Sequence, residues 1–144
     1  PLQAVEVPGD ISGALGNSPA ECLKGETDLM AVFAHEQDIR SLRPDFDRLK
    51  EFPYRGIIVT APGEQCDFVS RFFGPAVGVD EDPVTGSAHT MLIPYWADRL
   101  GVNKLIARQL SSRGGELFCQ AAGNRVLIAG HAVTYLMGQI TIHL

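Results

Sequence analysis

The spacing of apolar residues along the chain predicts several strands. Residues 28–34 form a compact apolar run, and residues 56–61 form a β-branched run that ends at the turn signal Pro62-Gly63. Residues 66–73 alternate well enough to be the partner strand of the second run. Four further strand-like runs follow later in the chain, joined by hairpin-like connections and one bend: 105–110, 116–121, 125–129 and 132–144.

Residues 86–100 follow a different pattern and predict the main helix. Apolar side chains lie on nearly every face of this helix, which ends at Gly101. A helix that is apolar all round is expected to be buried rather than laid on a surface. Shorter helices are expected around residues 10–15 and over residues 44–51. These elements predict an α+β fold in which a curved, mostly antiparallel or mixed sheet wraps around one buried central helix.

The composition fits one globular domain over residues 1–144, with 45% hydrophobic and 20% charged residues. The net charge of −5 provides no basic field that would attract nucleic acid or an anionic membrane. Neither a signal peptide nor a membrane-spanning run is present in the sequence, so we expect a cytoplasmic protein. Pro1 is not a natural first residue, which is the pattern expected of a fragment.

The cysteine and histidine residues predict neither a disulfide framework nor a metal site. The cysteines are odd in number and widely separated, so we expect reduced and mostly buried thiols. The histidines show no ligand spacing, and no metal is expected. The residues concerned are Cys22, Cys66, Cys119, His35, His89, His131 and His143.

A short acidic loop before the main helix carries the strongest candidate chemistry. Residues 78–85 contain Pro83 and lead into a Thr-Gly-Ser turn at residues 85–87. The first N–H groups of a helix lack partners, and the helix dipole places partial positive charge there, so this helix start attracts an anion. Asp82 and Ser87 flank the turn beside it. The combination suits an acidic small molecule that is held while a proton is moved.

The same stretch resembles a known family. Residues 73–79 (FGPAVGV) and 81–89 (EDPVTGSAH) resemble the signature of the phenazine-biosynthesis isomerase family, the PhzF-like proteins. Together with further pieces that resemble this family in the same order, the resemblance spans about residues 29–138. The further pieces are residues 55–60, 67–71, 94–96 and 109–115.

The resemblance implies a fold and an activity. The chain would be the C-terminal lobe of a diaminopimelate-epimerase-like fold, in which two α/β lobes face each other. The activity would be cofactor-independent isomerisation of a small cyclic or amino-acid-like carboxylic acid by proton transfer at carbon. In this family the proton-shuttling glutamate and a substrate-contacting histidine lie in the other lobe, which nothing in residues 1–28 resembles. An N-terminal lobe or a second chain is therefore the expected partner, and the isolated chain is expected to be inactive.

The resemblance also assigns roles to particular residues. Asp82 and Ser87 are the expected catalytic residues, because they would hold the reacting groups of the substrate, and Thr85 and Gly86 are expected to bind substrate. Each has a simpler alternative: Asp82 as a turn residue, Ser87 as a first-turn residue and Thr85 as the N-cap. Arg71 is expected to pair either with a substrate carboxylate or in an ordinary ion pair.

We expect structural rather than catalytic roles for three nearby side chains. His89 lies two residues after Ser87 and points to a different side of the helix, so it is expected to pack or cap. Glu81 is expected to face solvent and Arg113 to be an ordinary turn charge.

The sequence bears on two alternative functions, a cysteine-type racemase and a non-catalytic module. A cysteine-type racemase would need a thiol at the Gly-rich helix start, where this chain has a Thr-Gly-Ser turn. That turn argues against the racemase. The second is a non-catalytic module that binds an acidic metabolite or forms a homodimer through the face that would meet the other lobe.

Overall fold

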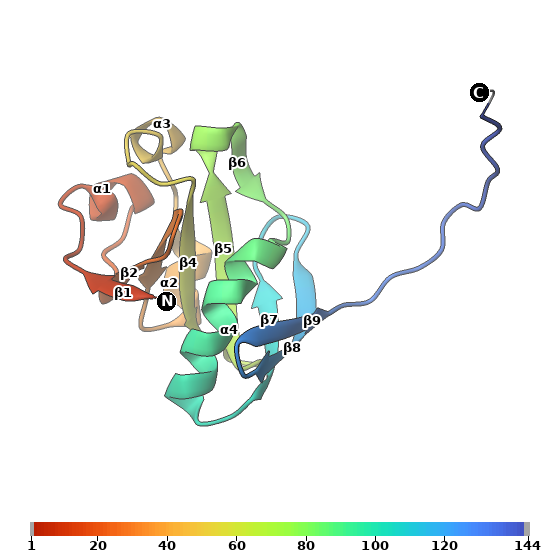
Figure 1. Ribbon diagram of the computed structural model, residues 1–144. Helices are drawn as coiled ribbons and strands as arrows, with labels where there is room; N and C mark the ends of the chain where they lie inside the picture. Colours follow the sequence, from red (N-terminus) through yellow and green to blue (C-terminus); the bar gives the residue numbers. More distant parts are fainter. Residues whose placement is uncertain (1, 143–144) are drawn as a thin grey trace.

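The structure is a computed structural model that describes residues 2–142, and it is built on one open, nine-stranded mixed sheet. The strand order is β1-β2-β3-β4-β5-β7-β8-β9, with β6 paired to β5 off this path (Figure 1). The pairs β3–β4 and β5–β7 are parallel and the others are antiparallel. The strands are β1 (Gln3–Val5), β2 (Glu21–Lys24), β3 (Asp28–Val32), β4 (Gly56–Pro62), β5 (Phe68–Gly74), β6 (Val79–Asp82), β7 (Lys104–Gln109), β8 (Gly115–Ala122) and β9 (Arg125–Ala129).

Helices cover both faces of the sheet but do so unequally. Three short helices cover one face beside β3, β4 and β5, while α4 covers the other face and reaches β7, β8 and β9. The α+β expectation is therefore confirmed, with a mixed sheet against one main helix. The helices are α1 (Ile11–Leu15), α2 (Glu36–Ser41), α3 (Phe46–Leu49) and α4 (Gly86–Leu100), with a 3₁₀ turn, η1, at Pro75–Val77.

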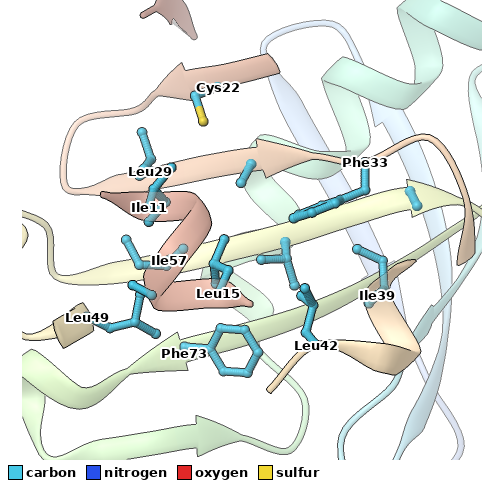
Figure 2. Packing of buried hydrophobic residues seen from close by; sticks show 14 of the residues in the cluster. Ile11, Leu15, Cys22, Leu29, Phe33, Ile39, Leu42, Leu49, Ile57 and Phe73 are labelled. Atoms are coloured by element: carbon cyan, nitrogen blue, oxygen red, sulfur yellow. The ribbon is translucent and has the colours of Figure 1, made fainter. Parts of the chain in front are cut away.

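Alternation along the strands divides the core into two clusters. On β3, Leu29 and Ala31 face the short helices, whereas Met30 and Val32 face α4. This is the period of two that a strand imposes on its side chains. Figure 2 shows the first cluster, in which Ile11 and Leu15 of α1 lie over Leu29, Ile57 and Phe73 of the sheet.

The second cluster fixes α4 on the sheet. Trp96 is 1% exposed, its ring stacks on Phe68 with centroids 5.8 Å apart, and its Nε1 donates to Thr60 Oγ1 at 2.9 Å. The opposite side of α4, which includes Thr90 and Asp98, is exposed. The expectation of a helix buried all round is therefore wrong for that side, because no described element packs against it.

The C-terminal segment also differs from expectation. Residues 130–142 form no strand, although a strand was predicted over 132–144; the last two of those residues lie outside the described part. A strand needs a hydrogen-bonded partner, and none of the described residues supplies one to this segment. Val133 is 91% exposed and Tyr135 is 98% exposed as the segment runs away from the body (Figure 1).

Residues 2–142 show neither a membrane-spanning helix nor a metal-binding cluster. Within that range, none of the helices has the length and apolarity needed to cross a membrane. The same residues contain no group of three or more His, Cys, Asp or Glu side chains that could hold a metal ion.

Candidate active site

The acidic loop is positioned by its attachment to β5. The αL conformation of Gly78, with φ of 82°, ends the turn η1 and lets the chain reverse into β6. β6 pairs with β5, so that Asp82 lies opposite Phe72, and its register shifts before Gly74. Asp82 is thus the last residue of an edge strand, and only three residues separate it from the first turn of α4. Residues 79–82, which were predicted as part of a loop, therefore form a short strand.

The side chain of Gln109, at the end of β7, holds the loop from the sheet side. Its Oε1 accepts from the Thr85 backbone N–H at 2.8 Å. Its Nε2 donates to the Asp82 backbone carbonyl at 2.7 Å and to Thr85 Oγ1 at 3.1 Å. The neighbouring turn adds a further contact, because Ser111 Oγ donates to the Pro83 carbonyl at 2.8 Å. Sequence reasoning did not identify Gln109 as part of the site.

Thr85 is the N-cap residue of α4, but its hydroxyl does not cap the helix. The hydroxyl instead donates to Asp82 Oδ2 at 2.5 Å. The first turn of α4, which begins with the exposed residues Gly86 and Ser87, is therefore left without the side-chain acceptor that an N-cap threonine usually supplies. An external anion at this turn would meet N–H donors and the positive end of the helix dipole.

Ser87 lies in that first turn and is exposed. Its Oγ accepts from Nη2 of Arg55 at 3.1 Å, and Arg55 Nε in turn donates to Oδ1 of Asp28 at 2.9 Å. Asp28 is 3% exposed, and its hydrogen bond raises the pKa of the Arg55 guanidinium above the ordinary value. Because the Ser87 oxygen is used as an acceptor, its own proton remains free for an external acceptor. Neither Arg55 nor Asp28 was identified from the sequence.

Gly86 stands between Thr85 and Ser87 at an exposed position. A Cβ added there would meet no other atom within 4 Å, so the packing of the described chain does not require glycine. Gly115, by contrast, is required by packing, because a Cβ there would lie 2.4 Å from Cγ2 of Val84. The space in front of Gly86 is consistent with the close approach of a ligand to the backbone.

Arg71 lies apart from this site. Its Nε donates to Oε1 of Glu81 at 2.7 Å and its Nη1 to the Ile39 carbonyl at 3.2 Å, while its guanidinium lies over the ring of Phe73 on the face covered by the short helices. The ion-pair alternative for Arg71 therefore matches the geometry. Glu81 is a member of that pair rather than a solvent-facing side chain. Arg55 supplies the guanidinium beside Ser87 instead.

His89 packs and anchors the loop, as expected from its position. It is fully buried, and its Nδ1 lies 2.7 Å from the Thr85 carbonyl. Because a carbonyl can only accept, Nδ1 carries the proton, and burial lowers the pKa of His89 below its ordinary value. Its Nε2 has no hydrogen-bond partner among the described residues.

The cysteines lie outside the site and are free thiols. Burial raises the pKa of Cys22 and of Cys119 to about 11 and raises the pKa of Cys66. These thiols are poor nucleophiles near neutral pH, and the start of α4 contains a serine instead. Both observations argue against the cysteine-type racemase.

A separate groove of about 590 Å³ lies along β7, β8 and β9, and its lining includes Ile106, Phe118 and Leu127. It contains none of the loop residues described above. The candidate site itself is thus an edge at which Gly86 and Ser87 are exposed, Asp82 and Arg55 are partly exposed and Thr85 is buried beneath them. It is a wall without an opposing surface in the described chain.

Comparison with known proteins confirms the resemblance seen in the sequence. A family model described as "Phenazine biosynthesis-like protein" matches residues 10–138. An uncharacterized isomerase of Pseudomonas aeruginosa is 54% identical over 133 residues, which cover 92% of this chain and 51% of that protein. Phenazine biosynthesis-like domain-containing protein 2 of Mus musculus is 38% identical over 153 residues, with 94% and 53% covered. A solved PhzF family structure from Enterococcus faecalis gives a TM-score of 0.89 at 42% identity, covering 93% of this chain and 52% of that one.

These comparisons cover the whole candidate site. The matched residues 10–138 include every residue from Asp28 and Arg55 through Gln109. The chain spans about half the length of the curated relatives it matches. On this evidence of sequence and structure, the chain belongs to the phenazine biosynthesis-like family, the PhzF-like proteins.

Proposed function

We propose that this chain forms one wall of the active site of a cofactor-independent isomerase that moves a proton at a carbon of a small carboxylic acid. The observation that carries the proposal is the placement of the Asp82 carboxylate and the Ser87 hydroxyl at the two ends of one clamped loop, beside a helix start that Thr85 does not cap. Relatives named as isomerases, at 54% and 40% identity, support the reaction class.

The geometry suggests how this wall would hold an acidic substrate. The substrate carboxylate would accept from N–H groups of the first turn of α4 and from the free proton of Ser87. Arg55 would add positive charge behind the serine, held in place by the buried Asp28. Asp82 Oδ2 is occupied by Thr85, which leaves Oδ1 as the oxygen that would accept from a polar group of the substrate.

The acid and base of the reaction would come from outside this chain. A glutamate carboxylate on the opposing wall would take a proton from one substrate carbon and return it to another, so that no atoms are gained or lost. Asp82 and Ser87 would orient the substrate, and the Ser87 hydroxyl with the first N–H groups of α4 would stabilise negative charge while the carbanion exists. We propose no cofactor and no metal for this reaction. The opposing wall would be an N-terminal lobe or a second chain, and the described chain alone would be inactive.

A second candidate function is favoured by one observation. Residues 133–142 expose several large apolar side chains, among them Tyr135, Leu136 and Ile140. Exposed apolar side chains of this kind favour self-association, so the chain would then be a non-catalytic module that dimerises through this segment. Light scattering on the chain would give a stable homodimer for the module and a concentration-independent monomer for the isolated wall. The cytoplasmic location expected from the sequence stays a prediction.

The isomerase proposal is tested by deuterium incorporation from solvent. A chimera in which this chain replaces the matching segment of the Pseudomonas aeruginosa relative is incubated in D₂O with cyclic and amino-acid-like carboxylic acids, and NMR reads exchange at carbon. We expect exchange that falls about a hundredfold or more in Asp82→Asn and in Ser87→Ala. Asp80→Asn is the matched control, since Asp80 is an exposed carboxylate on the same strand.

Two results would contradict the proposal. An unchanged rate of deuterium incorporation in both site variants would show that Asp82 and Ser87 take no part in the reaction. No exchange by a folded chimera that still binds one of the acids tightly would leave a metabolite-binding module.

A further inference from the structure

We propose that Gln109 is a positioning residue that fixes the direction of the Thr85 hydroxyl and, through it, the orientation of the Asp82 carboxylate. This inference rests on the proposed function and goes beyond it, because Gln109 itself reaches no exposed surface of the cleft. Gln109 is 1% exposed, and its side-chain amide contacts both Asp82 and Thr85.

The backbone of the loop determines which way the amide of Gln109 points. The Thr85 N–H can only donate, so the atom 2.8 Å from it must be the amide oxygen. The Asp82 carbonyl can only accept, so the atom 2.7 Å from it must be the amide nitrogen. A flipped amide would lose both bonds. The orientation of Gln109 is therefore set by two backbone groups of the loop, the Thr85 N–H and the Asp82 carbonyl.

The fixed amide in turn determines the direction of the Thr85 hydroxyl. The second N–H of Gln109 donates to Thr85 Oγ1 at 3.1 Å, so the hydroxyl oxygen is already used as an acceptor. Its single proton is then directed to Asp82 Oδ2, 2.5 Å away. The result is a one-way chain of hydrogen bonds from Gln109 through Thr85 to Asp82. The carboxylate is held by one oxygen and presents the other to the cleft.

Thr85 is held from the helix side as well. The protonated Nδ1 of His89 donates to the Thr85 carbonyl, so the N–H, the carbonyl and the hydroxyl of this residue all have partners. Thr85 can therefore neither rotate its side chain nor shift its backbone without losing hydrogen bonds. A residue fixed in this way is suited to transmit the position of Gln109 to Asp82.

Gln109 is itself anchored in the middle of the sheet. It lies in register with Ser70 of β5, and the next residue, Leu110, donates its N–H to the Ser70 carbonyl at 2.7 Å. The loop lacks such support of its own, because β6 is a short edge strand with an irregular register. The amide of Gln109 thus connects a rigid strand to Asp82 and Thr85 of the loop, beside the single bond that Ser111 Oγ makes to the Pro83 carbonyl.

Four variants separate this role from a general effect on stability. Gln109→Glu keeps an acceptor for the Thr85 N–H but loses both donors, so the Thr85 hydroxyl would turn toward the new carboxylate and away from Asp82. Thr85→Val removes the hydroxyl at nearly constant shape, whereas Thr85→Ser keeps it and serves as the conservative rescue. The double variant Gln109→Glu/Thr85→Val tests whether the two residues act through one path.

The first measurement needs no substrate and uses this chain. Hydrogen exchange by NMR follows the two Nε2 protons of Gln109. We expect both to be protected in the wild type and in Thr85→Ser, and one to exchange roughly tenfold faster or more in Thr85→Val. Fast exchange of both protons in the wild type, or no change in Thr85→Val, would overturn the proposed hydrogen-bond direction.

The second measurement uses deuterium incorporation by the chimera. We expect kcat to fall about tenfold to a hundredfold in Gln109→Glu and in Thr85→Val with KM little changed, while Thr85→Ser stays within about threefold of the wild type. The double variant should be no slower than the slower single variant. Wild-type kcat in Gln109→Glu, or losses that multiply in the double variant, would overturn the positioning role. A wild-type chimera without exchange, together with protected Nε2 protons, would refute the proposed function and leave Gln109 as a purely structural clamp.

Discussion

The two halves of the sheet are built differently, and the candidate site lies where they meet. Every residue of β3 is buried, and β4 is buried from Gly56 to Ala61, because helices cover both faces there. β7 and β8 instead alternate between buried and exposed residues, because only α4 covers them. Continuous apolar runs mark the first half and alternating runs mark the second, as expected for strands covered on two faces and on one face.

Because the site lies between the two halves of the sheet, side chains from both halves can hold the acidic loop and the start of α4. The strand β4 follows Arg55, which reaches Ser87 from the doubly covered half. The strand β7 carries Gln109, which reaches Asp82 and Thr85 from the other half. Side chains that need a fixed geometry are thus supported by two different strands rather than by the loop alone.

The largest expected effect comes from removing Trp96, the buried side chain by which α4 packs on β4 and β5. Trp96→Ala would lose the stack on Phe68 and leave Thr60 Oγ1 without its buried donor. We expect a loss of about 3–5 kcal/mol in the free energy of unfolding, measured with urea. Leu127→Ala, on the exposed face of the second half at 57% exposure, is the control and should cost about 0.5 kcal/mol or less. Equal losses in the two variants would contradict the division of the sheet into differently covered halves.

A smaller effect is expected from the ion pair under the site. Asp28→Asn leaves the Arg55 guanidinium, 38% exposed, without its buried carboxylate. We expect a loss of about 1–3 kcal/mol in urea unfolding, discounted for the partial exposure of the arginine. Asp47→Asn is the matched control, because its partner Lys50 and its own side chain are exposed, and it should change stability by about 0.5 kcal/mol or less. A loss at Asp28 no greater than the loss at Asp47 would show that Arg55 is not fixed by burial of its partner.

The smallest effect is a pH dependence from His89. Burial lowers the pKa of His89 below its ordinary value of 6.5 in the folded chain, so the unfolded state binds a proton first as the pH falls. Stability contributed by neutral His89 is therefore present above about pH 6.5 and is lost as the pH falls through that value, at up to about 1.4 kcal/mol per pH unit.

The comparison of variants isolates this contribution. His89→Gln keeps a donor for the Thr85 carbonyl and should flatten the decline in unfolding free energy between about pH 7.5 and 5.5. His131→Gln, at an exposed position, should follow the wild type. The same slope in all three proteins would contradict a buried neutral His89.

The sequence predicted the parts of the fold that carry strong local patterns. The bounds of α4 were predicted correctly because its apolar run begins after a Thr-Gly-Ser turn and ends at Gly101. The pairing of β4 with β5 was predicted because a turn signal separates two apolar runs, and the structure makes this pair antiparallel. The helix α2 was missed because its six mostly polar residues carry no periodic signal, although Ile39 is buried in the cluster against the sheet.

The sequence predicted only those site residues that lie within one continuous motif. Asp82 and Ser87 belong to one continuous stretch, whereas Gln109 approaches that stretch from 24 residues away and Arg55 pairs with Asp28 across 27 residues. Such contacts follow from the parallel pairing of β5 with β7 and of β3 with β4, which apolar spacing along a single chain does not encode. Arg71 lies in the separate matching piece at residues 67–71, and the alternation of β5 places it on the face of the short helices, away from the start of α4.

The most direct measurement of the central claim maps a small acid onto this chain by NMR. Cyclohexanecarboxylate is titrated against the ¹⁵N-labelled chain, with cyclohexanecarboxamide as the uncharged control of the same shape. The account predicts shifts confined to the backbone amides of Gly86, Ser87 and Ala88 with the carboxylate and none there with the amide. Shifts at Ile106, Phe118 and Leu127 instead, or equal shifts with both compounds, would contradict a carboxylate-binding wall at the start of α4.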